Sequence, residues 1–316
     1  MTNHSPNLIG QQFVTDGGLE TDLIFNRGID LPEFAAFVLM EDEDGRAALR
    51  DYYHQYIDIA VAAGVPILLE TPTWRASPEW GAKLGFDQAA LDRINRESVE
   101  FLADLATERA HELTGWEVGG MIGPRGDGYQ PGVETDPDEC AALHRHQLAA
   151  FHAAGATRAS VLTMTETAEA LGIARAAADV GIPVVIGFTV ETDGRLPDGT
   201  TLGEAIAIVD ADTPPEYYVI NCAHPTHISE ALDGGDWNQR IGGLRVNASK
   251  LSHAELDECE VLDDGHPMEL ALGVAGLRES FPNAAVIGGC CGTDARHVAA
   301  AWGVTAARTV ESQIAS

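Results

Sequence analysis

Short apolar runs alternate with longer amphipathic segments along the whole chain. The runs are rich in Val, Ile, Leu and Tyr, and turn-forming or capping residues separate them from the helix-like segments that follow. Strands that alternate with helices form parallel sheets, so this order predicts repeated βα units. Eight strands are expected, near residues 13–16, 65–70, 117–122, 159–163, 184–189, 217–222, 241–247 and 285–290. The pattern therefore predicts an α/β protein folded as a single (β/α)8 TIM barrel.

Helix start and stop signals occur between the expected strands. Asp136 is a suitable capping residue, Pro137 suits the first helical position, and Gly155 suits the end of the same helix. Ser77 and Pro78 give a similar start signal directly after the second expected strand. No low-complexity linker divides the chain, so we expect one domain that spans all 316 residues.

Chemically reactive side chains gather at the ends of the expected strands. In an eight-stranded barrel, the carboxyl ends of the strands form the active-site face. Cys222 ends the sixth expected strand, and Cys290 and Cys291 end the eighth, which is two positions further around the barrel. Three thiolates on one side of the mouth suit Zn²⁺, which takes four tetrahedral ligands. Asn221 ends strand six together with Cys222, and other strands end in Asp16, Glu70, Thr71 and Asn247.

The paired cysteines also allow other interpretations. Glycines flank the pair and would let both sulfurs aim at one point, which a regular strand prevents. The same spacing is compatible with two buried small side chains or with a strained disulfide between neighbours. His224 and His227 follow Cys222 and offer a mixed Cys/His site, although we interpret them as residues of the loop after strand six.

Composition excludes several classes of function. The chain has 49 acidic and 19 basic residues, and the resulting net charge of −30 repels phosphate backbones and anionic membranes. We therefore expect neither nucleic acid nor a membrane as a partner. The chain has no run of eighteen apolar residues and its first residues lack a secretion signal, so a cytoplasmic protein is expected.

The number of cysteines and one acidic segment are interpreted without a catalytic role. Five cysteines in a chain of this length argue against a disulfide framework. Residues 255–264 are strongly acidic, and we interpret them as a solvated segment in which Cys259 is incidental.

Five motifs in combination resemble one enzyme family. They are Asp16-Gly-Gly-Leu-Glu-Thr-Asp22, Thr71-Pro-Thr-Trp-Arg-Ala-Ser77, Gly120-Met-Ile-Gly-Pro124, Asn221-Cys222 followed by Pro225, and Gly288-Gly-Cys-Cys-Gly-Thr293. In this order they resemble the zinc-dependent homocysteine S-methyltransferase family, which includes betaine- and S-methylmethionine-using enzymes. The resemblance covers about residues 10–303. It implies an eight-stranded barrel that binds zinc, and a homocysteine thiol that binds the metal.

The resemblance also implies roles for individual residues. The implied zinc ligands, which activate the thiol through the metal, are Cys222, Cys290 and Cys291. The expected substrate contacts are Asp16, Gly17, Thr71, Arg75, Asn221 and Asn247. Among them, Asp16 matches an aspartate that contacts the amino-acid part of homocysteine.

Three positions depart from the family pattern. Leu162 stands where members usually carry a glutamate that contacts the substrate ammonium, and loss of such a charge partner costs several kcal/mol of recognition. The candidate replacements are Glu166, Glu70 and Glu191. Arg75 stands where betaine-using members place a tyrosine, and Val246 replaces a proline. An arginine in the pocket favours a ligand with a carboxylate.

The charge of three cysteinates indicates alkyl transfer rather than hydrolysis. Such a site is a weaker Lewis acid than a histidine site, yet it still lowers the pKa of a bound thiol from about 8.5. We therefore predict a zinc-dependent S-methyltransferase that moves a methyl group from a small onium donor to a zinc-bound thiol, with homocysteine giving methionine.

Two alternatives stay open. One is a divergent family member that acts on another sulfur, selenium or methylamine substrate, with or without a carboxylate. The other is a zinc-binding protein without turnover. The sequence leaves open the methyl donor, the thiol acceptor and whether the chain forms a homo-oligomer.

Overall fold

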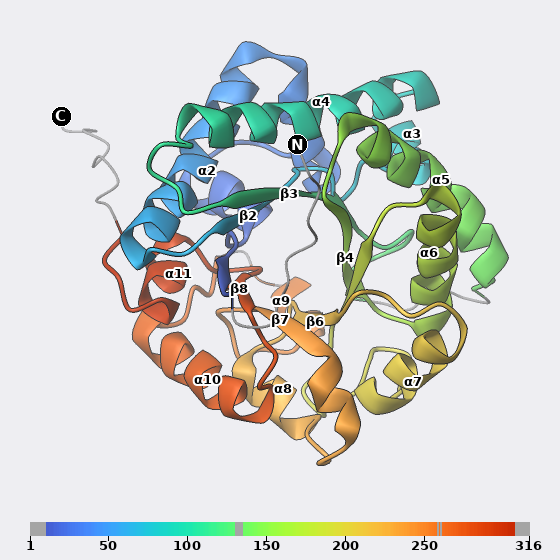
Figure 1. Cartoon of the computed structure of the whole chain (residues 1–316), viewed down its shortest axis with the longest axis vertical. Helices are drawn as coiled ribbons and strands as arrows, with labels where there is room; N and C mark the ends of the chain where they lie inside the picture. The colour runs from blue at the N-terminus through green and yellow to red at the C-terminus, as the bar shows by residue number, and fades with distance from the viewer. Residues whose placement is uncertain (1–10, 130–134, 258, 260, 307–316) are drawn as a thin grey trace.

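Eight parallel strands close into one barrel, in which each strand pairs with its neighbours in sequence and β1 pairs with β8 (Figure 1). The computed structural model describes residues 11–129, 135–257, 259 and 261–306. The strands are β1 Phe13–Val14, β2 Ile67–Glu70, β3 Trp116–Ile122, β4 Arg158–Met164, β5 Val184–Phe188, β6 Tyr218–Asn221, β7 Ile241–Val246 and β8 Val286–Gly289. The predicted barrel is confirmed, although β1, β5, β6, β7 and β8 end one or two residues earlier than expected.

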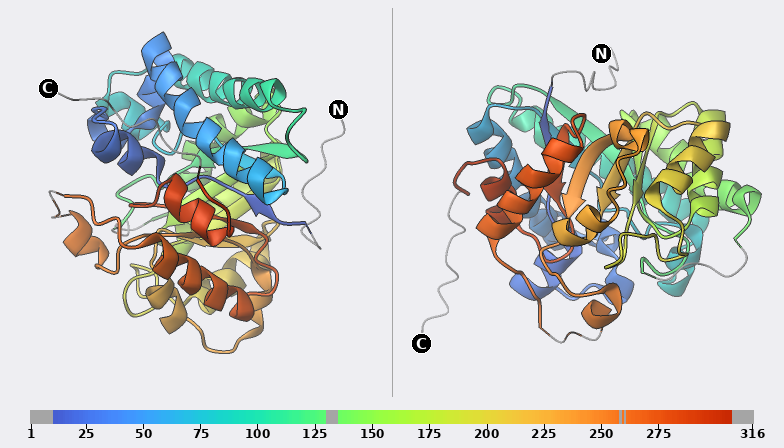
Figure 2. Two further views of the ribbon diagram at one scale, coloured as in Figure 1. Left: turned by 90° about the vertical axis from the view of Figure 1, so that its left-hand side faces the viewer. Right: turned by 90° about the horizontal axis from the view of Figure 1, so that it is seen from below.

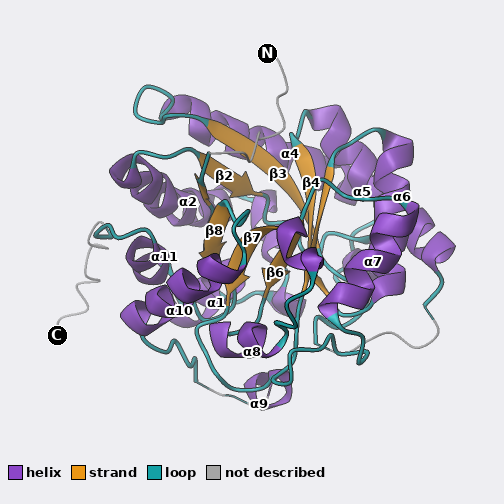
Figure 3. Cartoon of the chain, turned by 60° about the horizontal axis from the view of Figure 1, so that its bottom comes forward, coloured by secondary structure: helices purple, strands orange, loops and turns teal. Residues whose placement is uncertain are grey.

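Helices surround the barrel (Figure 3). The longer ones are α2 Glu43–Ala63, α4 Gln88–Glu108, α5 Pro137–Ala154, α6 Thr167–Val180, α7 Leu202–Asp212 and α10 Pro267–Ser280. The short ones are α1 Leu19–Thr21, α3 Pro78–Lys83, α8 Pro225–Glu230, α9 His253–Asp257 and α11 Ala295–Ala301. The remaining turns are η1 Asp22–Asn26, η2 Pro32–Phe34, η3 Ala36–Glu41 and η4 Asp236–Arg240.

The expected helix signals mostly act as predicted. The Asp136 side chain accepts a hydrogen bond from the Asp138 N–H at the start of α5, and Gly155 ends that helix with a left-handed φ of 83°. Pro78 begins α3, but the Ser77 side chain makes no capping bond. Its hydroxyl is buried without a hydrogen-bond partner among the described residues. Ser77 therefore contributes its backbone conformation rather than a side-chain cap.

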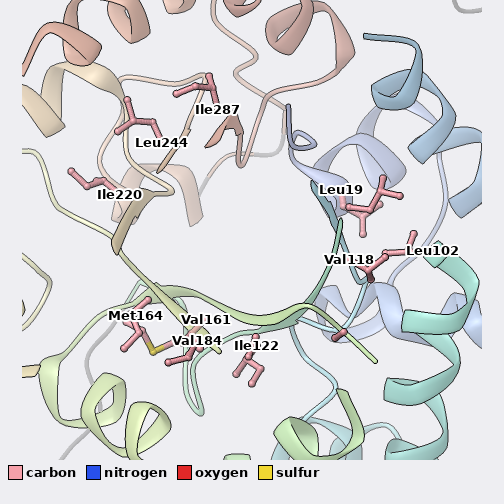
Figure 4. Close-up of a cluster of buried hydrophobic side chains, with 14 of the residues drawn as sticks. Leu19, Leu102, Val118, Ile122, Val161, Met164, Val184, Ile220, Leu244 and Ile287 are labelled. Atoms are coloured by element: carbon pink, nitrogen blue, oxygen red, sulfur yellow. The ribbon is translucent and has the colours of Figure 1, made fainter. Parts of the chain in front are cut away.

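Apolar side chains pack on both sides of the strands. Figure 4 shows Ile122, Ile220, Leu244 and Ile287 pointing outward from the barrel, and these residues belong to the core cluster shared with the helices. A second cluster fills the barrel interior, and it consists of Phe13, Leu68, Met121, Leu162, Val185, Tyr217, Val219 and Val286. Truncation of a fully buried residue such as Ile220 would cost about 2–5 kcal/mol of stability. The two layers hold the strand ends at fixed positions.

Several short segments lie at one end of the barrel. In the right-hand view of Figure 2, α9 projects at the same end as the N-terminal segment from α1 to η3. These segments follow the carboxyl ends of β7 and β1, so they flank the face on which barrel sites form. Among the described residues, no helix combines the length and apolar character needed to cross a bilayer.

Candidate metal and substrate site

Three cysteine sulfurs converge at the carboxyl ends of β6 and β8. Cys222 follows β6, and Cys290 and Cys291 follow β8. Their Sγ atoms all lie within 4.8 Å of one another, and 3.5 Å separates those of Cys222 and Cys291. All three cysteines are free of disulfide bonds. Within the described ranges this is the one cluster of three or more His, Cys, Asp or Glu ligand atoms with such spacing.

Glycine is required beside the cysteine pair because β1 passes close to β8. A Cβ atom on Gly288 would lie 2.5 Å from the backbone oxygen of Asp16, and the Gly289 N–H donates to that same oxygen at 2.8 Å. The two cysteines come after the last residue of β8, and Gly292 then takes a left-handed φ of 78°. Strand alternation no longer applies there, so both sulfurs can face the same side.

A second device fixes the orientation of Cys222. Its φ of 55° is left-handed, which is costly for a residue with a side chain. Three donors bind its carbonyl oxygen: Thr189 Oγ1 at 3.1 Å, Asn247 Nδ2 at 3.0 Å and His253 Nε2 at 2.8 Å. His253 is held in turn by Glu191, 2.7 Å from its Nδ1. These bonds stabilise the backbone that aims the sulfur, as outer-shell partners do in metal sites.

A buried ion pair lies beside the cysteines. Arg245 Nη2 lies 2.7 Å from a carboxylate oxygen of Asp16, and both side chains are almost fully buried. Arg245 also donates to Thr15 Oγ1 at 3.1 Å, and the hydroxyl of Tyr52 donates to Asp16 at 3.1 Å. Burial raises the pKa of Asp16, and the Arg245 charge offsets part of that rise. The pair therefore holds Asp16 in one position at the barrel mouth.

The thiols share protons among themselves. Hydrogen bonds from the Cys222 and Cys291 thiols, together with the positive charge of Arg245, lower the pKa of Cys290 well below its usual value. The same hydrogen bonds and burial raise the pKa of Cys222. The Tyr129 hydroxyl adds a further donor at 3.5 Å from the sulfur of Cys291. A cation bound by all three sulfurs would displace the remaining thiol protons.

A cavity of about 350 Å³ opens over the sulfurs. Its apolar and aromatic wall includes Phe25, Phe34, Trp74, Met121, Tyr129 and Leu162. Its charged wall includes Asp16, Glu20, Arg75, Asp127, Arg245 and Asp263. A cavity of this size suits a small molecule, and its few convergent charges can orient one.

Six predicted site residues line this cavity and three do not. Those in the wall are Cys222, Cys290, Cys291, Asp16, Gly17 and Arg75. Thr71 instead accepts from the Met121 N–H at 2.8 Å, which ties β2 to β3. Asn221 pairs with both the N–H and the hydroxyl of Thr163, and Asn247 binds the Cys222 carbonyl. In these placements Thr71, Asn221 and Asn247 hold neighbouring backbone and side chains, and their contact with a substrate stays a prediction.

Leu162 faces the cavity, and none of the three candidate replacement carboxylates does. Glu70 lies buried inside the barrel, where burial raises its pKa to about 7. Glu191 binds His253, and Glu166 accepts from the Thr135 hydroxyl at 2.6 Å. A carboxylate that the sequence analysis did not consider, Glu20, lines the cavity instead.

The sequence analysis missed three residues of the site. Arg245 had a signal, because a lone arginine within an apolar strand needs a buried partner. Glu20 lies within the first motif, but no pattern indicated that its side chain faces the cavity. Tyr129 had no signal, since its ring reaches the sulfurs from the segment after β3 and stacks on His253 with ring centroids 4.1 Å apart.

The acidic segment after β7 also borders the cavity. We expected residues 255–264 to be solvated, and no side chain that the structure describes in this segment is buried. Leu256, Leu262 and Asp263 nevertheless line the cavity, and so does the exposed Cys259. Net charge alone could not show this, because it does not tell which residues of a solvated segment lie at the barrel mouth.

The two histidines after Cys222 belong to the loop and to α8, as interpreted. His224 is the cap of α8 and its Nδ1 accepts from the Thr226 N–H at 3.2 Å. Burial, with the nearby positive charges of His227 and Lys250, lowers the pKa of His224 to about 4. His227 lies with its Nε2 3.0 Å from the Lys250 carbonyl oxygen.

His224→Asn should reduce the loss of stability in acid. The unfolded histidine titrates near a pKa of about 6.5, so as the pH falls it takes a proton before the folded one does. Stability that depends on neutral His224 is therefore lost between about pH 6.5 and 4. Asparagine keeps a capping acceptor and cannot titrate. Urea unfolding at pH 7.5 and 5 gives the free energy of unfolding at each pH. Between these two values it should fall by about 1–2 kcal/mol less in His224→Asn than in the unaltered protein. The control is His146→Asn, because His146 is exposed. If the unaltered protein and both variants lose the same free energy of unfolding between pH 7.5 and 5, the prediction is wrong.

Comparison with solved structures shows the same fold. The homocysteine methyltransferase MmuM from Escherichia coli matches in its oxidised form with a TM-score of 0.75 and 23% identity, covering 96% of this chain and 99% of that chain. Its metallated form matches with a TM-score of 0.74 and 21% identity, over the same shares of the two chains.

Comparison of sequences shows the family. The methionine synthase of Mycobacterium leprae (strain TN) is 33% identical over 141 residues, and this match spans 42% of the present chain but only 11% of the synthase. The family described as homocysteine S-methyltransferase matches residues 13–302, which is most of the chain. With its barrel and its three convergent cysteines, the chain belongs to the homocysteine S-methyltransferase family, a family of methyltransferase enzymes.

Proposed function

We propose that the protein is a zinc-dependent thiol S-methyltransferase that moves a methyl group from a small onium donor to homocysteine, giving methionine. The observation that carries the proposal is the cluster of three cysteine sulfurs within 4.8 Å of one another beneath a cavity of about 350 Å³. Family membership supports the reaction class and the acceptor. The assignments of zinc as the metal and of an onium compound as the donor are inferred from the chemistry of the three thiolates.

The three sulfurs fit zinc. Tetrahedral Zn²⁺ with Zn–S bonds of about 2.3 Å needs sulfurs about 3.8 Å apart. The Cys222 and Cys291 sulfurs are 3.5 Å apart, and all three sulfurs lie within 4.8 Å of one another. Cys222, Cys290 and Cys291 would hold the ion and leave the fourth position for a ligand. When bound, zinc lowers the pKa of an incoming thiol and keeps it as a nucleophilic thiolate.

The remaining residues prepare the transfer. Tyr129 and Leu162 form part of a largely apolar wall that limits water around the sulfurs, and the Asp16–Arg245 pair offers fixed charges to an amino-acid substrate. In the reaction a new S–CH₃ bond forms while the carbon–heteroatom bond of the donor breaks and its electron pair stays on the donor atom. The thiol proton leaves to solvent before the transfer. The protein's main task is to align donor and acceptor.

The test is detection of methionine by mass spectrometry. Zinc-loaded protein is incubated with homocysteine and, separately, S-methylmethionine, S-adenosylmethionine, glycine betaine and dimethylsulfoniopropionate. We expect methionine with one of these donors and none from chelator-treated protein. If protein that holds zinc forms no product with any donor, the acceptor assignment is wrong. A zinc-binding protein without turnover would also show no change in its cobalt-substituted spectrum when thiols are added.

A further inference from the structure

The Tyr129 hydroxyl contacts two of the three cysteine sulfurs. It donates to Cys291 Sγ at 3.5 Å and lies 3.7 Å from Cys222 Sγ. A phenol is protonated at neutral pH and therefore acts as a hydrogen-bond donor. The third sulfur, that of Cys290, has a more distant donor, because Asn221 Nδ2 lies 3.9 Å away. Each sulfur of the cluster thus lies within reach of a donor that is not another cysteine.

Two contacts hold the tyrosine in this position. The ring stacks on His253 with ring centroids 4.1 Å apart, and the Tyr129 N–H donates to Asp127 Oδ1 at 2.8 Å. His253 in turn lies 2.8 Å from the carbonyl oxygen of Cys222 and 2.7 Å from Glu191. The ring is therefore fixed to the same backbone that aims a cysteine sulfur, and its hydroxyl keeps a defined place beside the cluster.

A methyl donor in the cavity can reach more than one nucleophile. Cys222, Cys290 and Cys291 line the cavity that would admit a thiol, and tetrahedral zinc ligands lie only about 3.8 Å apart. Cys290 and Cys291 are half-buried, so their sulfurs are not sealed from the cavity.

Methylation of a cysteine would damage the site. A new S–CH₃ bond would form on that cysteine while the carbon–heteroatom bond of the donor breaks and its electron pair stays on the donor atom. The product is a neutral thioether, which lacks the charge with which a thiolate binds zinc. An enzyme that works through three cysteinates therefore has to direct the methyl group away from them.

We propose that Tyr129 determines which sulfur is methylated, because its hydroxyl protects the cysteine sulfurs, above all that of Cys291. A hydrogen bond stabilises the charge of a sulfur and lowers its nucleophilicity. The single hydroxyl proton is already directed at Cys291, so a thiol that arrives as the fourth ligand stays the stronger nucleophile. The assignment to selectivity rests on the proposed function, since it requires a methyl donor and an incoming thiol.

The test measures methylation of the protein's own cysteines and needs no turnover. Zinc-loaded protein without homocysteine is treated with iodomethane, which needs no binding site, and peptide mass spectrometry follows the methyl group on each cysteine over time. Cys291 should be methylated about 3–10-fold faster in Tyr129→Phe than in the unaltered protein, because a hydrogen bond to a charged sulfur is lost. Phenylalanine keeps the ring that stacks on His253, so access to the sulfur changes little.

Two references make the comparison specific. Cys259 is exposed and its thiol donates to the Glu255 carbonyl, so its methylation rate should be the same in both proteins. Tyr218→Phe is the matched control, because it removes a hydroxyl that lies 2.9 Å from Asp210 and outside the cavity wall. Cobalt-substituted protein gives a second readout. Without the Tyr129 hydroxyl, the sulfur-to-cobalt charge-transfer band should move to lower energy at unchanged cobalt content.

Several results would overturn the inference. They are an unchanged rate at Cys291 in Tyr129→Phe, an equal rise at Cys259, the same effect in Tyr218→Phe, or a cobalt band that does not move. Loss of zinc from Tyr129→Phe would also overturn it, because the hydroxyl would then hold the site together rather than protect a sulfur. A protein that forms methionine without the change at Cys291 would keep the proposed function and lose this inference. The change at Cys291 in a protein that forms no methionine would contradict the proposed function and leave the protection by Tyr129 standing.

Discussion

Replacement of Cys290 by serine is expected to remove zinc from the protein and to abolish methyl transfer. Cys290 is the sulfur whose pKa is lowest, because neighbouring thiols donate to it and Arg245 lies nearby. A hydroxyl in its place stays protonated at neutral pH and is a poor zinc ligand. Loss of an outer-shell partner typically costs about 10–100-fold in metal affinity, so loss of a direct ligand should exceed that.

Two measurements check the Cys290→Ser prediction. Elemental analysis after dialysis against a chelator gives the zinc retained per chain, and mass spectrometry under single-turnover conditions gives methionine formed. Cys140→Ala is the matched control, because Cys140 is buried on α5 away from the cavity. A Cys290→Ser protein that is active and free of metal would refute the zinc mechanism.

Arg245→Met is expected to produce the largest loss of stability. Arg245 is 4% exposed and Asp16 is 1% exposed, so removal of the arginine leaves a buried carboxylate without its counter-ion. Breaking a buried pair in this way costs about 3–5 kcal/mol. Glu70 adds to the effect, because the Arg245 charge also lowers the pKa of that buried carboxyl.

The loss should become smaller as the pH falls. Without Arg245, the folded pKa values of Asp16 and Glu70 rise further above their unfolded values. The folded state then binds more protons than the unfolded state, so the variant becomes more stable as the pH falls from 7.5 to 5.5. Urea unfolding across this pH range measures the free energy of unfolding of the variant. The double variant Arg245→Met/Asp16→Asn should recover part of the stability that Arg245→Met loses. A free energy of unfolding equal to that of the unaltered protein at pH 7.5 would show that the pair contributes nothing.

Much of the fold and the cluster of three cysteines followed from local pattern. Alternating apolar runs and helix signals predicted all eight strands, because the period of each element is set by its own backbone geometry. A closed barrel brings the carboxyl ends of its strands to one face, so cysteines at the ends of strands six and eight had to lie near each other. The five motifs then indicated the family that the chain matches over residues 13–302.

Side-chain direction could not be predicted in the same way. Asn221 is the last residue of β6 and Asn247 directly follows β7, yet their amides bind Thr163 and the Cys222 carbonyl, and neither residue lines the cavity. Which neighbour satisfies a buried amide depends on strand register and on the left-handed φ at Cys222, and neither is written in a local pattern.

The sequence by itself determined the barrel and the three cysteines at its mouth, since each depends on periodicity or on position along the chain. Only the tertiary structure decided which charged side chains line the cavity. Glu20 reaches the cavity from the segment after β1, Arg75 from the segment after β2, and Tyr129 from the segment after β3. Loops from separate strands meet only after the barrel has closed, so their shared cavity is a property of packing rather than of any one stretch of chain.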